Sequence, residues 1–402
     1  MEALSEQYEI VFISFIRSEK EKEYVKHIKP FCKRIEVCNI ERSVRKNIID
    51  AFKSIFLGKS FIVLRDFVTE MQGLIDKVIK EENPDFIHID HLQMAQYIKG
   101  DKKGIKILDE HNVEYQILKR IFEIEKNYFK KIFTYYEFNK LKKVEKEACL
   151  ESDLVITVSD LDKRTLADMT CNNVRFKTIP IGVDTEYFFY QPIRNKQENA
   201  IVFIGTLYWP PNIDAVMWFY KEVWGKLKNN NDIRNLNWKI IGLKPVDEIL
   251  QLAEIDKNID VHGSVADVRP FMREGSVFIV PLFSGSGMRV KILNAMACGI
   301  PVISTSIGAE GIEGLKPVNF NFCKEQTNYN LRFTIHDSNI WIADKPEEFI
   351  DAIMTLFINN ELRSQLSQSG RKLMEEKYSW KTQGEKLLAV YEEAKSLRRV
   401  IT

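Results

Sequence analysis

Cysteine is scarce in this chain, which has six cysteines among 402 residues. No pair has the close spacing of a zinc knuckle, and the density is too low for a disulfide scaffold. We therefore predict reduced thiols in a reducing, cytoplasmic compartment. These cysteines are Cys32, Cys38, Cys149, Cys171, Cys298 and Cys323.

Long apolar runs and a dominant charge are also lacking. No run reaches the roughly 18 residues that would span a bilayer, and the polar, acidic start Met1–Gln7 does not resemble a signal peptide. Any membrane contact is therefore expected to be peripheral, at the inner face. The formal net charge is +1, which gives no global field for nucleic acid, so we predict no nucleic-acid partner.

The length fits two domains. Short β-branched runs alternate with helical patterns, which is typical of parallel sheets covered by helices on both faces. The runs fall into two series, so we predict two doubly wound α/β units. The first series is Glu9–Phe15, Arg34–Asn39, Phe86–Asp90, Ile105–Asp109, Leu154–Val158 and Phe176–Ile181. The second is Ala200–Gly205, Trp238–Gly242, Ile259–His262, Val277–Pro281, Pro301–Thr305 and Ile340–Ala343.

A polar and aromatic stretch separates the two series. We place a linker at 186–199, after an N-terminal domain of residues 1–185 and before a C-terminal domain of residues 200–379. A helix is expected over 380–402, and the sequence permits it to cross back to the first domain.

The most informative stretch runs from Ser276 to Gly311. A buried strand ends at Pro281 and is followed by PLFSGSGMRVKILNAMACGIPVIST, residues 281–305. The helix expected from near Met288 directs free N–H groups at the Gly-Ser-Gly turn, which suits a diphosphate. Arg289 and Lys291, placed in its first turn, could add charge-assisted contacts.

The order of these residues resembles the signature of glycosyltransferase family 4, the group 1 glycosyl transferases. The resemblance extends to Phe203–Asn212, Val261–Val268, Gly308–Gly311, Tyr378–Trp380 and the "HN" loop Asp109–Glu114. It implies the GT-B fold, with two Rossmann-like domains and a cleft between them. It also implies retaining transfer from a nucleotide-diphosphate sugar, with no obligatory metal and no cofactor beyond the donor.

The resemblance also implies the residues of the site. His111, Arg289 and Lys291 are the predicted catalytic residues; the predicted donor-binding residues are Gly205, Thr206, His262, Gly263, Ser286, Gly287, Asn294 and Glu310. Ser286 and Asn294 stand where many members have glutamates. The loop Thr206–Asn212 lacks the basic residues that many members use, so Arg289 and Lys291 are the candidates to replace them.

Several of these residues have structural alternatives. Asn112 could cap a helix beside His111, and His262 could simply pack in its loop. His88 and His91 flank Asp90 as in a metal site, but nothing else in the sequence supplies ligands, so we favour loop hydrogen bonding and predict no metal. Asp160 is interpreted as a helix N-cap.

Two features concern partners. Family members usually begin with a strand and a glycine-rich loop, whereas this sequence begins inside the helix that follows. Either a preceding segment is missing from the sequence, or the protein lacks this part of the site. In the second case a second copy or a partner subunit could cover the apolar surface left open. Residues 119–146 mix lysines with aromatic residues and could form a surface for anionic lipids. Their acids dilute the charge, so we favour two ordinary helices with aromatic residues inward.

The sequence therefore predicts a glycosyltransferase acting on a glycan, lipid-linked or protein acceptor in cell-surface polysaccharide or glycoconjugate synthesis. The alternative is a degenerate, non-catalytic subunit that binds a nucleotide sugar or a partner enzyme, and a phosphorylase or epimerase on the same fold is a third hypothesis. A nucleotide-sugar panel with a turnover assay separates them.

Overall fold

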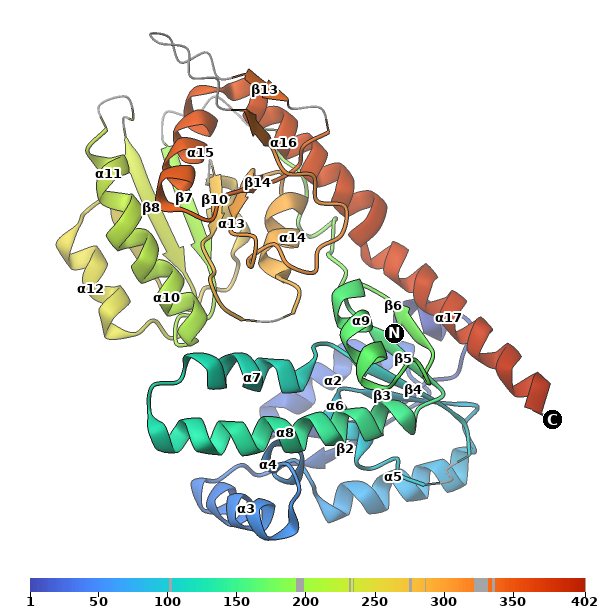
Figure 1. Cartoon of the computed structure of the whole chain (residues 1–402). Coiled ribbons are helices and arrows are strands. Elements are labelled where there is room, and N and C mark those ends of the chain that lie inside the picture. The colour runs from blue at the N-terminus through green and yellow to red at the C-terminus, as the bar shows by residue number, and fades with distance from the viewer. Residues whose placement is uncertain are drawn as a thin grey trace. The chain divides into compact units, whose positions relative to one another are not determined.

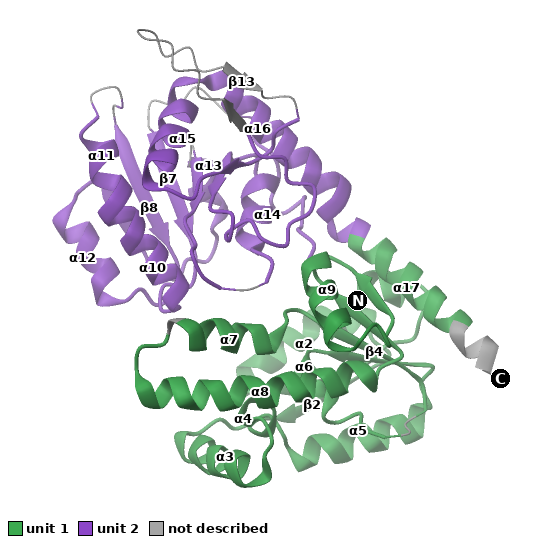
Figure 2. Cartoon of the chain, viewed as in Figure 1, with its two compact units in different colours: residues 1–180, 383–402 green, residues 181–382 purple. Residues whose placement is uncertain are grey.

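The computed structural model describes residues 1–401 apart from 101–102, 193–198, 231–232, 234, 275–276, 286, 322–331 and 335–336. The chain forms two compact units (Figure 2). Unit 1 contains residues 1–180 and 383–402, and unit 2 contains residues 181–382. Each unit is described by itself.

Unit 1 contains two parallel sheets. One has the order β1-β2 and the other β3-β4-β5-β6. The strands are β1 (Val11–Ile16), β2 (Arg34–Asn39), β3 (Phe86–Asp90), β4 (Ile105–Glu110), β5 (Leu154–Thr157) and β6 (Phe176–Thr178). The helices are α1 (Glu2–Ser5), η1 (Glu19–Glu21), α2 (Lys22–Ile28), η2 (Lys29–Phe31), α3 (Val44–Leu57), α4 (Phe61–Leu64), α5 (Thr69–Glu82), α6 (Leu92–Ala95), α7 (Glu114–Ile124), α8 (Tyr128–Leu150), α9 (Asp160–Met169) and, from residue 383, α17 (Trp380–Ile401).

The four-stranded sheet of unit 1 is buried on both faces, which explains its continuous apolar strands. Alternate residues point to opposite faces of a strand. Ile107 therefore joins a cluster with Tyr391 of α17, whereas its neighbour Leu108 joins a cluster with Leu141 of α8. Helices from distant parts of the chain thus cover the two faces.

Unit 2 contains one six-stranded parallel sheet with the order β14-β11-β10-β7-β8-β9, of which Figure 1 labels β14, β10, β7 and β8. Its strands are β7 (Asn199–Ile204), β8 (Leu236–Ile241), β9 (Ile259–His262), β10 (Val277–Val280), β11 (Val302–Ser304) and β14 (Trp341–Ile342). Its helices are α10 (Pro210–Phe219), η3 (Tyr220–Trp224), α11 (Gly225–Lys228), α12 (Asp247–Ile255), α13 (Arg269–Glu274), α14 (Val290–Ala297), α15 (Pro346–Ile358), α16 (Asn360–Leu373) and η4 (Met374–Tyr378).

The strand order of unit 2 creates a switch point. From β7 the chain builds outward through β8 and β9 on one side, and through β10, β11 and β14 on the other. The loops after β7 and β10 therefore leave the sheet in opposite directions at its carboxyl edge. Open α/β sheets bind ligands at such a point.

The twelve expected strands are all present, and their ends agree with the predictions to within three residues. The sequence reading missed the short antiparallel pair β12 (Asn319–Asn321) and β13 (Arg332–Thr334). Part of the expected linker, residues 193–198, lies outside the described residues. None of the helices in the described part of the chain combines the length and apolarity needed to cross a bilayer.

A glycine at the end of β8 can be tested directly. A Cβ atom at Gly242 would lie 1.6 Å from the carbonyl oxygen of Gly205, so β7 and β8 would have to separate. We expect Gly242→Ala to lower the free energy of unfolding by about 1–3 kcal/mol, as overpacked sites do. Gly225→Ala is the control, because no atom lies within 4 Å of that Cβ position. Equal urea midpoints for the two variants would contradict this packing.

Candidate functional site

The loop after β7 begins with a close backbone contact. The N–H of Gly205 donates to the carbonyl of Ile241 at 3.0 Å, and the Gly242 N–H donates to the carbonyl of His262 at 3.0 Å. A Cβ atom on Gly205 would lie 2.9 Å from the Lys291 Nζ. Glycine at position 205 therefore leaves room for a cation at the switch point.

Lys291 brings that cation from α14. Its Nζ donates to the Oδ1 of Asn212 at 3.0 Å and lies 4.7 Å from the centre of the Phe203 ring. The Nδ2 of Asn212 in turn donates to the carbonyl of Thr206 at 3.0 Å. Burial, with a smaller contribution from the charge of Arg289, lowers the pKa of Lys291 to about 7. The ammonium is thus held by one amide and needs an anion to remain fully charged.

The glycine turn before α14 has the backbone that the sequence predicts. Gly285 and Gly287 have φ angles of 111° and 80°, which other residues rarely adopt. The Arg289 Nη1 donates to the Gly287 carbonyl at 2.6 Å. Arg289 is the N-cap residue of α14, which begins at Val290, two residues after Met288 and so near the predicted start.

The structure brings together Gly205, the Thr206 backbone and Lys291, and it adds Asn212, which sequence reasoning did not select. The signal for Asn212 was its place at the end of the Phe203–Asn212 motif. Ser286 lies outside the described residues.

The other predicted donor residues occupy nearby strand ends and helices. The His262 ring packs against Phe271, with centroids 4.7 Å apart, and Gly263 is exposed. Asn294 is half-buried on α14. Glu310 is half-buried beyond β11, in a turn where the Gly308 N–H donates to the Thr305 Oγ1 at 2.9 Å. Their predicted contacts with a donor remain predictions.

In unit 1, His111 lies in a chain of polar contacts at the ends of β3 and β4. Its Nε2 lies 2.9 Å from the Asp90 Oδ1 and 3.9 Å from the Asp109 Oδ2. The His88 Nε2 lies 3.4 Å from the same Asp109 oxygen, and the His88 Nδ1 lies 3.0 Å from the Tyr391 hydroxyl. The hydrogen bond with Asp90 raises the pKa of His111 and lowers the pKa of Asp90. His111 is therefore held in its protonated form more readily than a free histidine.

His91 lies beside His111, with ring centroids 4.0 Å apart. Burial lowers its pKa, and so does the neighbouring His111. Potential ligand atoms of Asp90, His91 and His111 all lie within 4.8 Å of one another. These three side chains could hold a metal ion, and the sequence reading missed the third ligand because His111 follows a different strand.

A buried carboxylate caps the start of α7, the helix that follows His111 in the chain. Glu145 of α8 accepts hydrogen bonds from the N–H groups of Glu114 and Tyr115 at 2.7 and 3.1 Å. It therefore caps α7, whose N-cap residue is Val113 and not Asn112 as the alternative reading had it. Burial raises the pKa of Glu145 to about 8. Likewise, Ser159 and not Asp160 is the N-cap of α9.

Glu110 precedes His111 and is the least solvated acid of this group. It is 1% exposed, and neither carboxylate oxygen has a hydrogen-bond partner among the described residues. Burial, followed by the charge of Glu145, raises its pKa well above the usual range. A neutral Glu110 follows from this environment.

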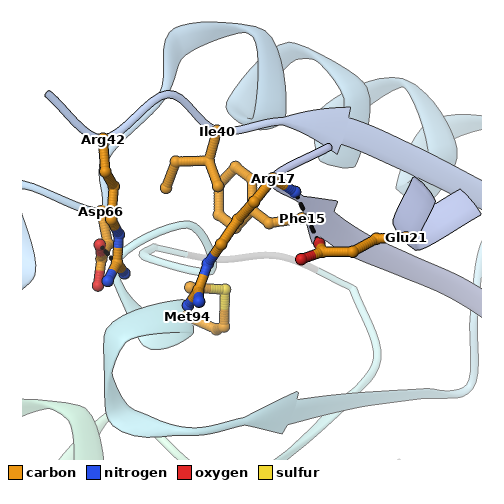
Figure 3. Close-up of a pocket in the computed structure, with 7 residues that line it drawn as sticks. All are labelled: Phe15, Arg17, Glu21, Ile40, Arg42, Asp66 and Met94. Carbon is orange, nitrogen blue, oxygen red and sulfur yellow. Dashed lines mark hydrogen bonds and ion pairs between the residues drawn. The ribbon is translucent and has the colours of Figure 1, made fainter. Parts of the chain in front are cut away.

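A pocket lies at the carboxyl ends of β1 and β2 in unit 1 (Figure 3). Arg17 and Arg42 both line it, and Arg42 pairs with Asp66 at 2.6 Å. The Arg17 backbone N–H donates to Glu21 at 2.8 Å, while its guanidinium extends toward Met94 (Figure 3). Glu21 and Asp66 line the pocket too, so two carboxylates balance the two guanidinium groups beside apolar side chains such as Met94.

Comparisons with known proteins relate this chain to glycosyl transferases. Residues 198–359 match the family model of "Glycosyl transferases group 1". An uncharacterized 44.6 kDa protein in the cps region of Klebsiella pneumoniae is 26% identical over 215 residues, which are 51% of this chain and 53% of that protein. The match thus spans about half of that relative. An uncharacterized glycosyltransferase of Methanocaldococcus jannaschii is 26% identical over 330 residues, which are 79% of this chain and 77% of that protein.

A solved structure shows the same fold. The Anabaena protein HepE in complex with UDP-glucose has a TM-score of 0.61 and 11% identity, over 95% of this chain and 99% of that chain. The two doubly wound units define the GT-B fold, as the sequence predicted. Within that class, residues 198–359 match the model of the group 1 glycosyl transferases, which agrees with the predicted resemblance. The narrower assignment to family 4 stays a prediction.

The pH dependence of stability tests the buried state of Glu110. Its pKa in the folded protein lies above its unfolded value, so its contribution is fully present below about pH 4.5 and is lost as pH rises through the folded pKa. Glu110→Gln stays neutral, so we expect its melting temperature to fall less than that of the wild type between pH 5 and 8. The control is Glu23→Gln, at a glutamate whose side chain is 78% exposed. If the melting temperatures of E110Q and the wild type change equally between pH 5 and 8, a buried neutral acid is excluded.

Proposed function

We propose that this protein is a retaining, metal-independent glycosyltransferase of the hexosyltransferase type. It transfers a sugar from a nucleotide-diphosphate sugar to a glycan, lipid-linked or protein acceptor. The observation that carries the proposal is the Lys291 ammonium at the switch point of unit 2, beside Gly205 and the N-terminus of α14.

The similar proteins support the substrate class. HepE is described in complex with UDP-glucose, and the Klebsiella relative is described as lying in a cps region. A nucleoside diphosphate sugar and a role in cell-surface polysaccharide or glycoconjugate synthesis are therefore part of the proposal. So are a cytoplasmic location and peripheral contact with the inner face of a membrane, where a lipid-linked acceptor is reached.

The chemistry follows from charge. As the bond between the anomeric carbon and the diphosphate oxygen breaks, negative charge builds on the leaving phosphate. Lys291, Arg289 and the free N–H groups of α14 would stabilise that charge without a metal. The acceptor oxygen then bonds to the anomeric carbon on the face from which the diphosphate leaves, and its proton passes to the leaving phosphate, so the sugar keeps its configuration. His111 stays the predicted catalytic residue of unit 1.

A second candidate is a subunit that binds a nucleotide sugar without turnover. Asn294 favours it, because a neutral amide stands on α14 where many similar proteins carry a glutamate. Calorimetry with a panel of nucleotide sugars, followed by donor hydrolysis and transfer assays, separates the two. Binding with no turnover on any acceptor supports the subunit and overturns the enzyme.

Removal of either cation tests the diphosphate site. We expect Lys291→Met and Arg289→Met each to weaken binding of UDP or the preferred nucleoside diphosphate roughly 10- to 100-fold, the range for a lost charge-assisted hydrogen bond. Sugar transfer should fall at least as much, while the melting temperature is retained. Lys226→Met is the control, because this lysine of unit 2 is 57% exposed and pairs with Glu347 at the surface. Unchanged affinity in both test variants would refute the assignment.

The pH dependence of binding gives an independent test. The pKa of Lys291 is about 7 in the ligand-free protein, so at pH 8 the side chain is mostly neutral. A bound diphosphate favours the ammonium form, so binding at pH 8 should take up a proton and the affinity should fall as pH rises from 7 to 9. Calorimetry at pH 8 in buffers of different ionisation enthalpy measures this uptake. It should be absent in Lys291→Met, and persistence there would assign the proton to another group.

A further inference from the structure

Two helices of unit 1 expose apolar side chains over most of their outer faces. Phe56 of α3 and Phe129 of α8 are 85% and 82% exposed. Eleven more large apolar residues on the same helices are also exposed: Val44, Ile48, Ile49, Phe52, Ile55 and Leu57 on α3, and Tyr128, Ile132, Phe133, Tyr135 and Tyr136 on α8. Single exposed apolar residues are ordinary, but thirteen on two helices indicate an interaction site.

The two helices are in contact within unit 1, where both are labelled in Figure 1. The Lys140 Nζ of α8 donates to the Ser54 carbonyl of α3 at 3.0 Å. In the segment that follows α3, the Ser60 hydroxyl donates to Glu137 at 2.6 Å, and the Phe61 and Phe133 rings lie 6.3 Å apart. The exposed side chains of residues 44–59 and 128–143 are therefore treated as one surface, the α3–α8 surface.

The charges on these helices are segregated by sign. Residues 44–59 and 128–143 contain two acids, Asp50 and Glu137. Both are buried, with exposed fractions of 6% and 2%. The cations are exposed or half-buried: Arg45, Lys46, Lys53, Lys59, Lys130, Lys131, Lys140, Lys142 and Lys143. The α3–α8 surface therefore combines apolar side chains with positive charge and carries no exposed acid in these ranges.

This combination selects one kind of occupant. Two copies meeting through the surface would bring like charges together, which is unfavourable when they are desolvated. An anionic lipid surface complements the charge, and the aromatic rings suit the boundary between head groups and acyl chains. Lysines beside that boundary add favourable electrostatic attraction.

We propose that the α3–α8 surface docks the protein on membranes that contain anionic lipids. This inference rests on the proposed function only in that it names the surface for the peripheral contact suggested there. The aromatic and aliphatic side chains enter the head-group region, while the cations contact lipid phosphates. The binding needs no nucleotide sugar.

Vesicle co-sedimentation of the full chain tests the proposal. We expect it to sediment with vesicles of phosphatidylglycerol and phosphatidylethanolamine, and to remain in the supernatant with phosphatidylcholine vesicles at moderate salt. Binding should weaken as salt concentration rises. Equal binding to both vesicle types, or no binding to either, overturns the proposal.

Matched variants locate the surface. Phe56→Ser with Phe129→Ser should weaken vesicle binding at least tenfold, because two apolar anchors are lost. The control pair is Ile255→Ser with Ile358→Ser, at residues of unit 2 that are 70% and 67% exposed. Equal loss in the two pairs would contradict a defined docking surface.

Charge reversal provides a second pair. Lys143 is 80% exposed and lies 4.0 Å from Glu147, and Lys26 of α2 is 78% exposed and lies 4.0 Å from Glu23. We expect Lys143→Glu to reduce binding to anionic vesicles roughly fivefold or more and Lys26→Glu to leave it unchanged. Equal effects of the two reversals would point to overall charge and overturn a local site.

Two further measurements keep this inference separate from the proposed function. Nucleoside diphosphate binding by calorimetry should be unchanged in the Phe56/Phe129 variant, so loss of one activity does not imply loss of the other. Sedimentation velocity should show the same mass for this variant and the wild type. A wild-type dimer that the variant lacks would assign the surface to self-association and overturn the membrane proposal.

Discussion

The placement of the Lys291 ammonium depends on two residues that have no side chain. A Cβ atom on Gly205 would approach the ammonium to 2.9 Å, and a Cβ atom on Gly242 would approach the Gly205 carbonyl to 1.6 Å. The ends of β7 and β8 can therefore lie close together and still leave room for a cation from α14. Since Asn212 supplies one acceptor, the remaining donors of the ammonium are suited to an anion, which connects the strand order of unit 2 to its proposed chemistry.

Unit 1 holds its predicted functional histidine by a different means. Glu145 caps α7 from the following helix α8, and Glu110, directly before His111, is buried with no hydrogen-bond partner among the described residues. Two acids in one apolar environment favour protonation, because each raises the free energy of the other's charged form. Asp90, by contrast, is exposed and remains the charged partner of His111. The buried acids Glu110 and Glu145 thus support the loop that carries His111. The exposed Asp90 instead favours the protonated form of His111.

The sequence sufficed for the strands and for the glycine turn before α14, because both depend on local patterns. Buried parallel strands are continuous β-branched runs, and Gly285 and Gly287 occupy positions where φ is positive. The cap of α7 could not be predicted, because its acceptor, Glu145, lies far along the chain and replaces the local cap expected at Asn112. Asn212 was likewise hidden within a motif, since its role depends on a lysine from another βα loop.

The exposed apolar face of α3 shows what a sequence pattern cannot establish. Helical periodicity identifies an amphipathic helix but not what covers its apolar face. The sequence also suggested that acids dilute the charge of residues 119–146. Glu137 and Glu145 are buried and neutralise little at the surface, whereas Glu123 is 53% exposed. The prediction that the aromatic residues face inward was wrong, because residues such as Phe129 are exposed. A net charge of +1 for the whole chain is therefore compatible with a strongly basic local field. In the folded protein some charged side chains are buried and others are exposed. The exposed charges, and not the net charge of the whole chain, determine which surfaces attract an anionic partner.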